Sequence, residues 1–284
     1  MKMALDQEFE QDIDEAEGKE MTFFDHLEEL RGHIIRSLLS ILVFTIVAWI
    51  FQKEIFGGII MAPTKATFWT NRMLNILADL SNIDSLHFKP AAFVLQSREV
   101  SGQFMMAFTQ SIMVGLLFAF PYFFWEIWRF VKPGLKLKEA KAARGAVFWV
   151  SVLFFLGILF GYYVVSPMAI NFLASYQLDE SIQNQFDIND YISLLSTMTL
   201  ACGITFQLPM ISFVLSQVGI LTPKLMRENR RYAIVIILII AALITPSPDM
   251  ISQLLVTTPL LGLYEVSIWV SARVKRQKDA ELLA

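Results

Sequence analysis

Six apolar runs, separated by polar segments, dominate the pattern of this chain. They cover residues 33–51, 104–128, 145–167, 191–218, 232–245 and 250–270. A helix rises 1.5 Å per residue, so about 20 apolar residues cross a hydrocarbon core roughly 30 Å thick. Four runs reach that length comfortably and the first just meets it, whereas 232–245 would rise only about 21 Å. The pattern predicts six crossing helices, the fifth of them short, with both termini on one side.

The polar segments divide the chain further. Residues 1–32 are acidic, lack the apolar stretch of a cleavable signal peptide and end in an amphipathic segment. The loop 52–103 is too long to lack structure, and apolar positions at helical spacing predict an amphipathic helix over 66–80, between Pro63 and Pro90. We therefore expect an N-terminal segment 1–32, a six-span domain 33–270 with the outer loop 52–103, and a tail 271–284.

Basic residues cluster on one side of these runs. Segments 129–144, 224–231 and 273–278 are rich in Lys and Arg, whereas 171–190 and 246–249 contain neither. Short loops rich in Lys and Arg stay in the cytoplasm. Both termini are therefore expected there.

Composition narrows the class of protein. Hydrophobic residues make up 55% of the 284 residues and charged residues 17%, against about 25% charged in soluble domains. The mean hydropathy is +0.53 and the net charge is -3. These values exclude a disordered chain, a nucleic-acid binder and an ordinary soluble enzyme. The single Cys202 excludes a disulfide scaffold and a cysteine zinc site. The fold class expected is an all-α integral membrane protein.

Proline and glycine positions shape the expected bundle. Prolines in four runs each remove a backbone hydrogen bond, which favours bent helices around a concave face; they are Pro121, Pro167, Pro209 and Pro259. Gly157 and Gly161 form a GxxxG pair that permits close helix approach. Packing within the chain is the favoured interpretation of that pair, and a dimer face, with self-association, is the alternative.

The chain lacks the common catalytic motifs. It contains no HExxH, GxSxG, phosphate-loop or GxGxxG pattern, so we expect no enzymatic activity and no cofactor. His26, Glu29 and His33 fall at positions that can share one helix face. Three such ligands beside an apolar run are weak evidence for a metal site, and none is expected.

Five acidic residues occupy unusual places. Acids in or beside a membrane span are costly and suggest function; here they are Glu29, Glu126, Glu139, Glu265 and Asp249. Glu29 precedes the first run, and Glu139 is the one acid in the basic segment 129–144. From charge placement alone, solvated carboxylates paired with nearby Lys or Arg are the favoured interpretation of those two.

A set of motifs resembles the TatC family, the C subunit of the twin-arginine protein translocase. His26-Leu-Glu-Glu-Leu-Arg31 precedes the first run, and Met61-Ala-Pro63 follows it in the outer loop. Trp128-x-Phe130-x-x-Pro-Gly-Leu comes before Glu139. Phe206-Gln-Leu-Pro209 lies in the fourth run, and Thr245-Pro-Ser-Pro-Asp249-x-x-Ser-Gln253 forms the last outer turn. These motifs occur in family order from residue 22 to about 275.

Two positions depart from the family pattern. The family commonly has Glu where this chain has Gln207, and the turn ending at Asp249 is one residue longer than usual. We interpret Gln207 as a polar group inside the fourth span that does not carry a proton.

The resemblance implies a receptor and scaffold subunit for export of folded proteins, driven by the protonmotive force across the bacterial cytoplasmic (inner) membrane. Its expected partners are twin-arginine signal peptides, single-span subunits of the TatA/TatB type and the lipid bilayer. By motif, Glu29 and Glu139 receive the two arginines, and Arg31 and Phe130 shape that surface.

The resemblance also implies that Thr245 and Gln253 lie where partner helices dock. The alternative function is a secondary transporter or channel with a polar path near Gln207 and Glu265.

Overall fold

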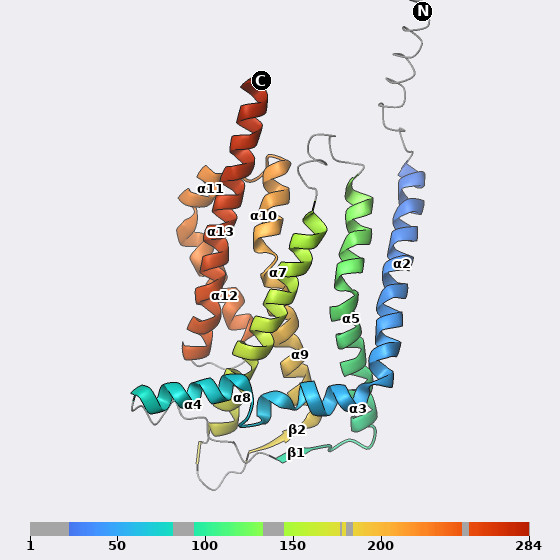
Figure 1. Ribbon diagram of the computed structural model, residues 1–284, viewed down its shortest axis with the longest axis vertical. Coiled ribbons are helices and arrows are strands. Elements are labelled where there is room, and N and C mark those ends of the chain that lie inside the picture. The colour runs from blue at the N-terminus through green and yellow to red at the C-terminus, as the bar shows by residue number, and fades with distance from the viewer. Residues whose placement is uncertain are drawn as a thin grey trace, which may run out of the picture.

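A computed structural model describes residues 23–81, 94–132, 145–176, 178–179, 184–245 and 250–283. Long helices run lengthwise through the molecule (Figure 1). They are α2 (Phe23–Ile50), α5 (Gly102–Val131), α7 (Ala146–Phe160) continued by η5 (Gly161–Val165) and α8 (Ser166–Ser175), α9 (Ile188–Thr205), α10 (Leu208–Gln217), α12 (Arg230–Ile244) and α13 (Met250–Leu283), with the short α11 (Pro223–Glu228) before α12.

Five helical segments are long and apolar enough to cross a membrane within the described ranges. They are Leu27–Ile50, Gly102–Val131, Ala146–Ser175, Ile188–Gln217 and Ser252–Ala280. Helix α12, which covers the fifth apolar run of the sequence, has only 15 residues and is not among these five segments. The short helix expected at that position is therefore present. Since α2 begins at Phe23, the end of the N-terminal segment and the first span form one continuous helix.

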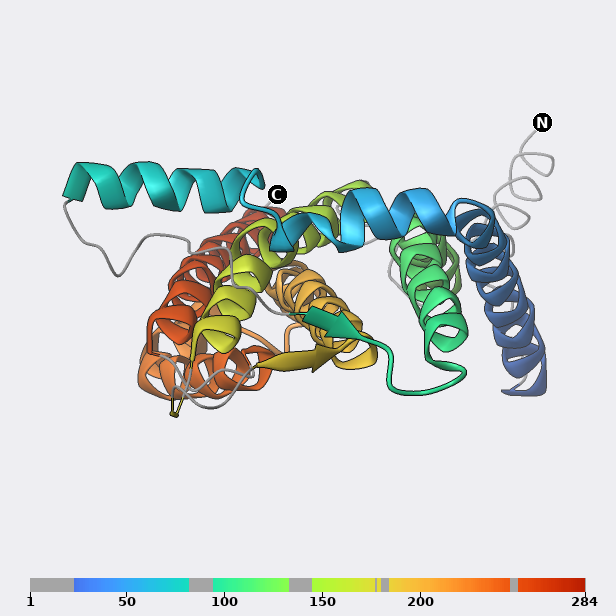
Figure 2. The same cartoon turned by 90° about the horizontal axis from the view of Figure 1, so that it is seen from below.

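The two ends of the bundle differ. The start of α2 and the end of α13 lie at the same end of the bundle (Figure 1). Near the other end, an outer layer lies across the helix axes, along one side of the bundle (Figures 1 and 2). It comprises α3 (Gln52–Ile55), η1 (Phe56–Ile60), η2 (Ala62–Thr64) and α4 (Trp69–Ser81). Helix α4 matches the amphipathic helix predicted over 66–80.

A small sheet accompanies this outer layer and was not predicted. Strand β1 (Val94–Gln96) pairs in parallel with β2 (Gln185–Asp187), with Leu95 opposite Phe186. The side chain of Asp187 then caps α9 by accepting a hydrogen bond from the Asn189 N–H at 2.8 Å. This bond, above all, holds the pKa of Asp187 below its ordinary value.

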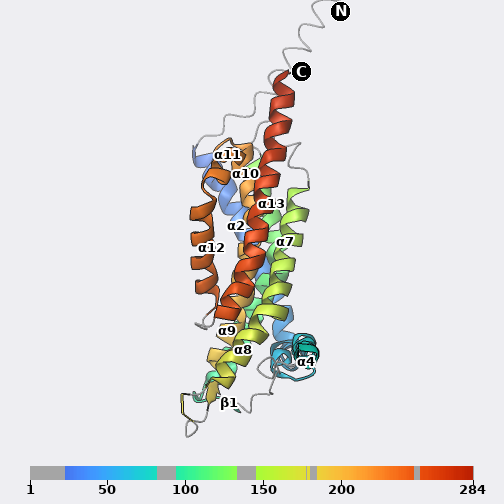
Figure 3. The ribbon, with the colours of Figure 1, turned by 90° about the vertical axis from the view of Figure 1, so that its left-hand side faces the viewer.

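The helices form an elongated arrangement with α2 and α5 on one side and α12 and α13 on the other (Figure 2). Seen from its left-hand side, the molecule is narrow (Figure 3). Many apolar side chains face outward, among them Leu38, Leu156 and Leu243 at 59%, 52% and 78% exposure. A lipid environment accounts for such exposure, because apolar patches of this extent are rare on soluble monomers.

Two of the four prolines coincide with helix boundaries. Helix α9 ends at Thr205 and α10 begins at Leu208, directly before Pro209. Pro167 lies in the first turn of α8, after the π-helical segment η5. Pro121 and Pro259 lie inside α5 and α13, which continue through them.

The GxxxG pair packs within the chain. A Cβ on Gly157 would lie 2.6 Å from the Cys202 carbonyl oxygen, and one on Gly161 would lie 2.9 Å from the Thr199 Cα. Both are closer than real Cβ contacts allow, so these glycines let α7 and η5 approach the backbone of α9. The favoured interpretation of the pair is confirmed.

Tyrosines attach the outer layer to the bundle. The Tyr191 hydroxyl on α9 donates to the Ile60 carbonyl at 2.7 Å, and the Tyr162 hydroxyl on η5 donates to the Ile59 carbonyl at 2.6 Å. Phe68 stacks on Tyr163 with ring centroids 5.3 Å apart. These contacts fix the position of the outer layer along the axes of the helices.

Candidate functional site

A buried carboxylate joins α2 to α5 near the end where α2 begins. Glu126 on α5 is 0% exposed, and its Oε2 lies 2.5 Å from Nδ1 of His33 on α2. Arg36 Nε donates to the same oxygen at 3.1 Å, and the Tyr122 hydroxyl donates to Oε1 at 2.9 Å. We call these four residues the Glu126 cluster. Separating α2 from α5 would leave the Glu126 carboxylate without its partners on α2, and an unpaired buried charge is costly. The cluster therefore holds the two helices together.

Glu29 occupies a different environment one helical turn from His33. Its side chain is 35% exposed, and its Oε1 lies 4.0 Å from His33 Nε2. Residues four apart share a helix face, so Glu29 stands above the Glu126 cluster on the same side of α2. The carboxylate of Glu126 is enclosed by partners, whereas the carboxylate of Glu29 is accessible to a cation from outside.

The structure brings Phe130 to this corner but not Arg31. The Phe130 ring meets the His33 ring edge-on, with centroids 6.1 Å apart. Arg31 is exposed and lies two residues after Glu29, about 200° around the helix. Glu139 lies in 133–144, outside the described residues.

Gln207 reaches a neighbouring helix. Its Nε2 donates to the Val150 carbonyl on α7 at 3.0 Å. Its Oε1 is buried and has no hydrogen-bond partner within the described ranges. The side chain therefore places a polar group inside the bundle, as expected, and links α7 to the interruption between α9 and α10.

Glu265 does not share a path with Gln207. Its side chain is 55% exposed, and its Oε2 accepts a hydrogen bond from Arg230 Nη2 of α12 at 2.7 Å. The two residues expected to line a solute path thus bind different partners, one buried and one at the surface. This separation gives no support to the transporter alternative.

The remaining predicted residues lie near the outer layer. The Thr245 side chain is buried and donates to the Ala241 carbonyl at 2.9 Å, while Gln253 Nε2 donates to the Leu238 carbonyl at 3.4 Å. Both side chains bind within the α12–α13 pair. Pro63 is buried in η2, where its carbonyl accepts from Asn71 Nδ2 at 3.0 Å. Asp249 lies outside the described residues.

Sequence analysis missed the Glu126 cluster. Glu126 stood out as an acid at the end of a span, and His33 was considered only as an unfavoured metal ligand. No group of His, Cys, Asp or Glu in the described part of the chain is arranged to hold a metal ion. The spacings along single helices, i, i+4 for Tyr122 and Glu126 and i, i+3 for His33 and Arg36, were the available signals.

Comparison with known proteins establishes the family. A family model described as Sec-independent protein translocase protein (TatC) matches residues 25–259. This chain belongs to the TatC family. TatC of Blattabacterium sp. subsp. Periplaneta americana (strain BPLAN) is 35% identical over 264 residues, covering 92% of this chain and 99% of that protein. TatC of Carboxydothermus hydrogenoformans is 34% identical over 259 residues, covering 91% of this chain and 96% of that one.

A solved structure agrees with the TatC assignment. The crystal structure described as the twin arginine translocase receptor TatC in DDM aligns with a TM-score of 0.67 and 29% identity, covering 87% of this chain and 99% of that one. The resemblance carried by the motifs is confirmed. The chain is a multi-pass membrane protein of a non-enzymatic transport family, the protein translocases.

Proposed function

We propose that this TatC-family chain is the receptor for twin-arginine signal peptides of folded proteins. In this proposal Glu29 and Glu139 each bind one arginine. The observation that carries it is the contrast between two acids. Glu126 is fully buried and contacts His33, Arg36, Tyr122 and Arg129, whereas Glu29 is accessible and, among the described residues, contacts only His33, at 4.0 Å.

The chemistry of the corner suits a guanidinium ion. A carboxylate binds both arms of a guanidinium, and lysine cannot reproduce that geometry. The aromatic ring of Phe130, against His33, adds a surface on which a guanidinium can stack. The Glu126 cluster serves as the rigid support that fixes the direction of Glu29.

The proposal includes orientation and location. The basic segments 129–144, 224–231 and 273–278 support a cytoplasmic position for the end bearing Glu29, under the positive-inside rule. Residues 1–32 and 271–284 are then cytoplasmic, 33–270 form the membrane domain, and the membrane is the bacterial cytoplasmic membrane. Export is driven by the protonmotive force.

Single-span subunits of the TatA/TatB type dock, in this proposal, along α12. Its outward side chains include Val235, Ile239 and Leu243, at 54%, 55% and 78% exposure. Thr245 and Gln253 hold the end of that surface through their bonds within the α12–α13 pair.

The test is binding of a signal peptide to the purified chain. A peptide with Arg-Arg should bind, and the same peptide with Lys-Lys should bind much more weakly. Glu29→Ala should weaken Arg-Arg binding by about 10- to 100-fold, because a hydrogen bond to a charged group contributes about 1.5–3 kcal/mol. Glu28→Ala removes an exposed acid from the adjacent position and is the matched control.

Combining Glu29→Ala with Glu139→Ala should abolish binding while membrane insertion persists. Wild-type affinity in the double variant, or equal losses for Glu28→Ala and Glu29→Ala, would refute the assignment.

A further inference from the structure

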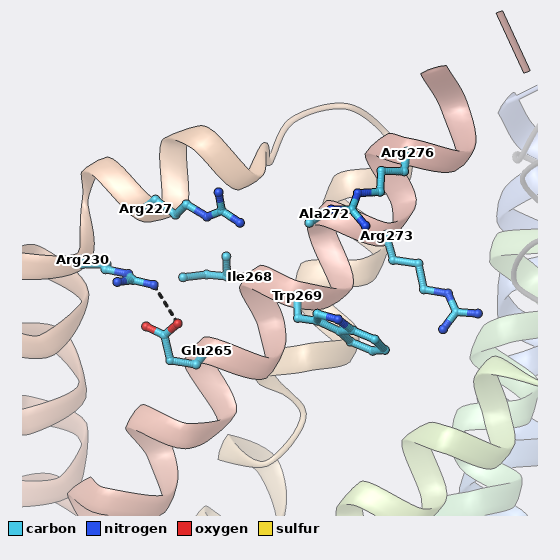
Figure 4. Close-up of a pocket in the computed structure, with 8 residues that line it drawn as sticks. All are labelled: Arg227, Arg230, Glu265, Ile268, Trp269, Ala272, Arg273 and Arg276. Carbon is cyan, nitrogen blue, oxygen red and sulfur yellow. Dashed lines mark hydrogen bonds and ion pairs between the residues drawn. The ribbon is translucent and has the colours of Figure 1, made fainter. Parts of the chain in front are cut away.

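A pocket of about 500 Å³ opens between α11, α12 and α13, at the end of the bundle where α2 begins. Figure 4 shows Arg227 and Arg230 extending from α11 and α12 toward α13, which carries the other lining residues. The pocket is lined by Arg227, Arg230, Glu265, Ile268, Trp269, Ala272, Arg273 and Arg276.

The charges of this arginine pocket are unbalanced. The lining contains four arginines and one carboxylate, Glu265, which pairs with Arg230. The Arg273 guanidinium lies over the Trp269 ring, 5.7 Å from its centroid, which is within the distance of about 6 Å for a cation–π contact. Arg227 and Arg276 form no ion pair with a carboxylate of the described residues. An anion from outside the chain would relieve the repulsion between these guanidinium groups.

The walls of the pocket are held in place by the fold. The Tyr264 hydroxyl on α13 donates to the Met226 carbonyl on α11 at 2.8 Å, next to Arg227. The Arg230–Glu265 pair bridges α12 and α13 on the other side (Figure 4). The helices that carry the arginines are therefore held together before any ligand binds, which lowers the entropic cost of binding.

An apolar groove adjoins the arginine pocket. It has a volume of about 610 Å³ and runs between α7, α10 and α13, with Trp269 and Arg273 lining both cavities. Its other lining is mainly apolar and includes Trp149, Leu153 and Phe213. A charged pocket that shares two lining residues with an apolar groove suits a molecule with an anionic head and a hydrocarbon chain.

We propose that the arginine pocket binds the phosphate of an anionic phospholipid, with one acyl chain lying in the adjoining groove. Basic pockets between membrane helices on the cytoplasmic side suit anionic head groups, and guanidinium groups bind phosphate oxygens in pairs. This inference is independent of the proposed peptide site, since none of its lining residues belongs to the Glu126 cluster or its surroundings.

The experiment is native mass spectrometry of the full chain in detergent, titrated with dioleoyl phosphatidylglycerol. One bound lipid should appear at concentrations where dioleoyl phosphatidylcholine, which has no net charge, binds about tenfold more weakly. Inorganic phosphate and glycerophosphoglycerol, which lacks acyl chains, should fail to displace the lipid. Displacement by either at equal concentration would show a site for free phosphate and overturn the lipid proposal.

Paired variants locate the site. Arg227→Gln with Arg276→Gln removes two charges that form no ion pair in the described structure and should weaken phosphatidylglycerol binding by about 30-fold. Lys224→Gln with Lys275→Gln removes two exposed charges from the same helices outside the pocket and should change binding by less than about threefold.

Equal effects in the two pairs, or unchanged binding in the first, would overturn the proposal. The comparison of lipids uses the unmodified chain, so it stands even where a variant folds poorly.

Discussion

His33 and Glu126 lie 93 residues apart in the sequence, and His33 Nδ1 and Glu126 Oε2 are 2.5 Å apart in the structure. The contact joins α2, which carries Glu29, to α5, which ends beside Phe130. Because His33 Nε2 also lies 4.0 Å from Glu29 Oε1, His33 connects the accessible Glu29 to the buried Glu126. The geometry of the proposed peptide site therefore depends on a cluster that does not itself face the peptide.

We predict that Glu126→Ala destabilises the chain by about 3–5 kcal/mol, because it leaves His33 and Arg36 beside a cavity without their carboxylate. The matched comparison is Glu265→Ala, which breaks the exposed pair with Arg230 and should cost about 0–1 kcal/mol. Reversible unfolding in detergent measures both. Similar losses for the two variants would show that the Glu126 cluster does not support the fold.

We also predict that Gly115→Ala separates α2 from α5. A Cβ at this position would lie 2.7 Å from the Thr45 backbone nitrogen, so one helix must move, at about 1–3 kcal/mol. Gly262→Ala is the control, because nothing lies within 4 Å of its Cβ and alanine favours a helix over glycine by about 0.5–1 kcal/mol. The melting temperature should fall in the first variant and hold or rise in the second. A drop in both would indicate that close approach at Thr45 is not the cause.

The length and spacing of apolar runs predicted most of this fold. Local composition and backbone chemistry predict the long apolar helices, the short α12, the interruption at Pro209 and the outer amphipathic helix α4. The β1–β2 pair escaped prediction because each strand has only three residues and its partner lies about 90 positions away, from Leu95 to Phe186.

The candidate site was less accessible to sequence analysis. Glu29 and Phe130 came from motifs, yet their meeting at His33 depends on how α2 packs on α5. The pairing of Arg230 with Glu265 likewise joins two helices, and spacing along one helix cannot reveal it. Packing between elements, which has no periodic signature, decides such contacts.

Substitutions at Gln207 test whether export needs a polar group at this position or a group that transfers a proton. Gln207→Leu removes the donor to Val150, so export at matched protein levels should fall and stability should drop by about 1 kcal/mol. Gln207→Glu should retain export, because a protonated carboxyl group can donate in the same direction. Export assays with immunoblot normalisation decide between the variants. Full export by Gln207→Leu would show that no polar group is needed at this position.

Asp187 gives a prediction for pH. The pKa of Asp187 is lowered in the folded chain, chiefly by the hydrogen bond from the Asn189 N–H. Its negative charge therefore stabilises the fold at pH values above the ordinary pKa of about 3.9. That contribution is lost as the pH falls through the lowered pKa of the folded chain. Asp187→Asn keeps the capping oxygen without the charge. The difference in melting temperature between wild type and this variant should stay constant from about pH 7 to about pH 5 and shrink below about pH 4. A difference that grows on acidification would contradict the assignment.

The length of α12 gives the last prediction. Its 15 residues rise about 22 Å, roughly 8 Å less than a typical hydrocarbon core, so the bilayer beside it should be thinned. Four apolar residues inserted after Ile239 lengthen the helix by about 6 Å and turn its end by only about 40°. If thinning recruits short partner helices, cross-linking of single-span subunits at Leu243, Thr245 and Gln253 should fall. Ile239→Leu keeps both the length of α12 and the apolar character of its exposed face, and it should leave cross-linking close to wild type. Equal cross-linking in the insertion variant and wild type would mean that the surface of α12, and not its length, recruits the partner.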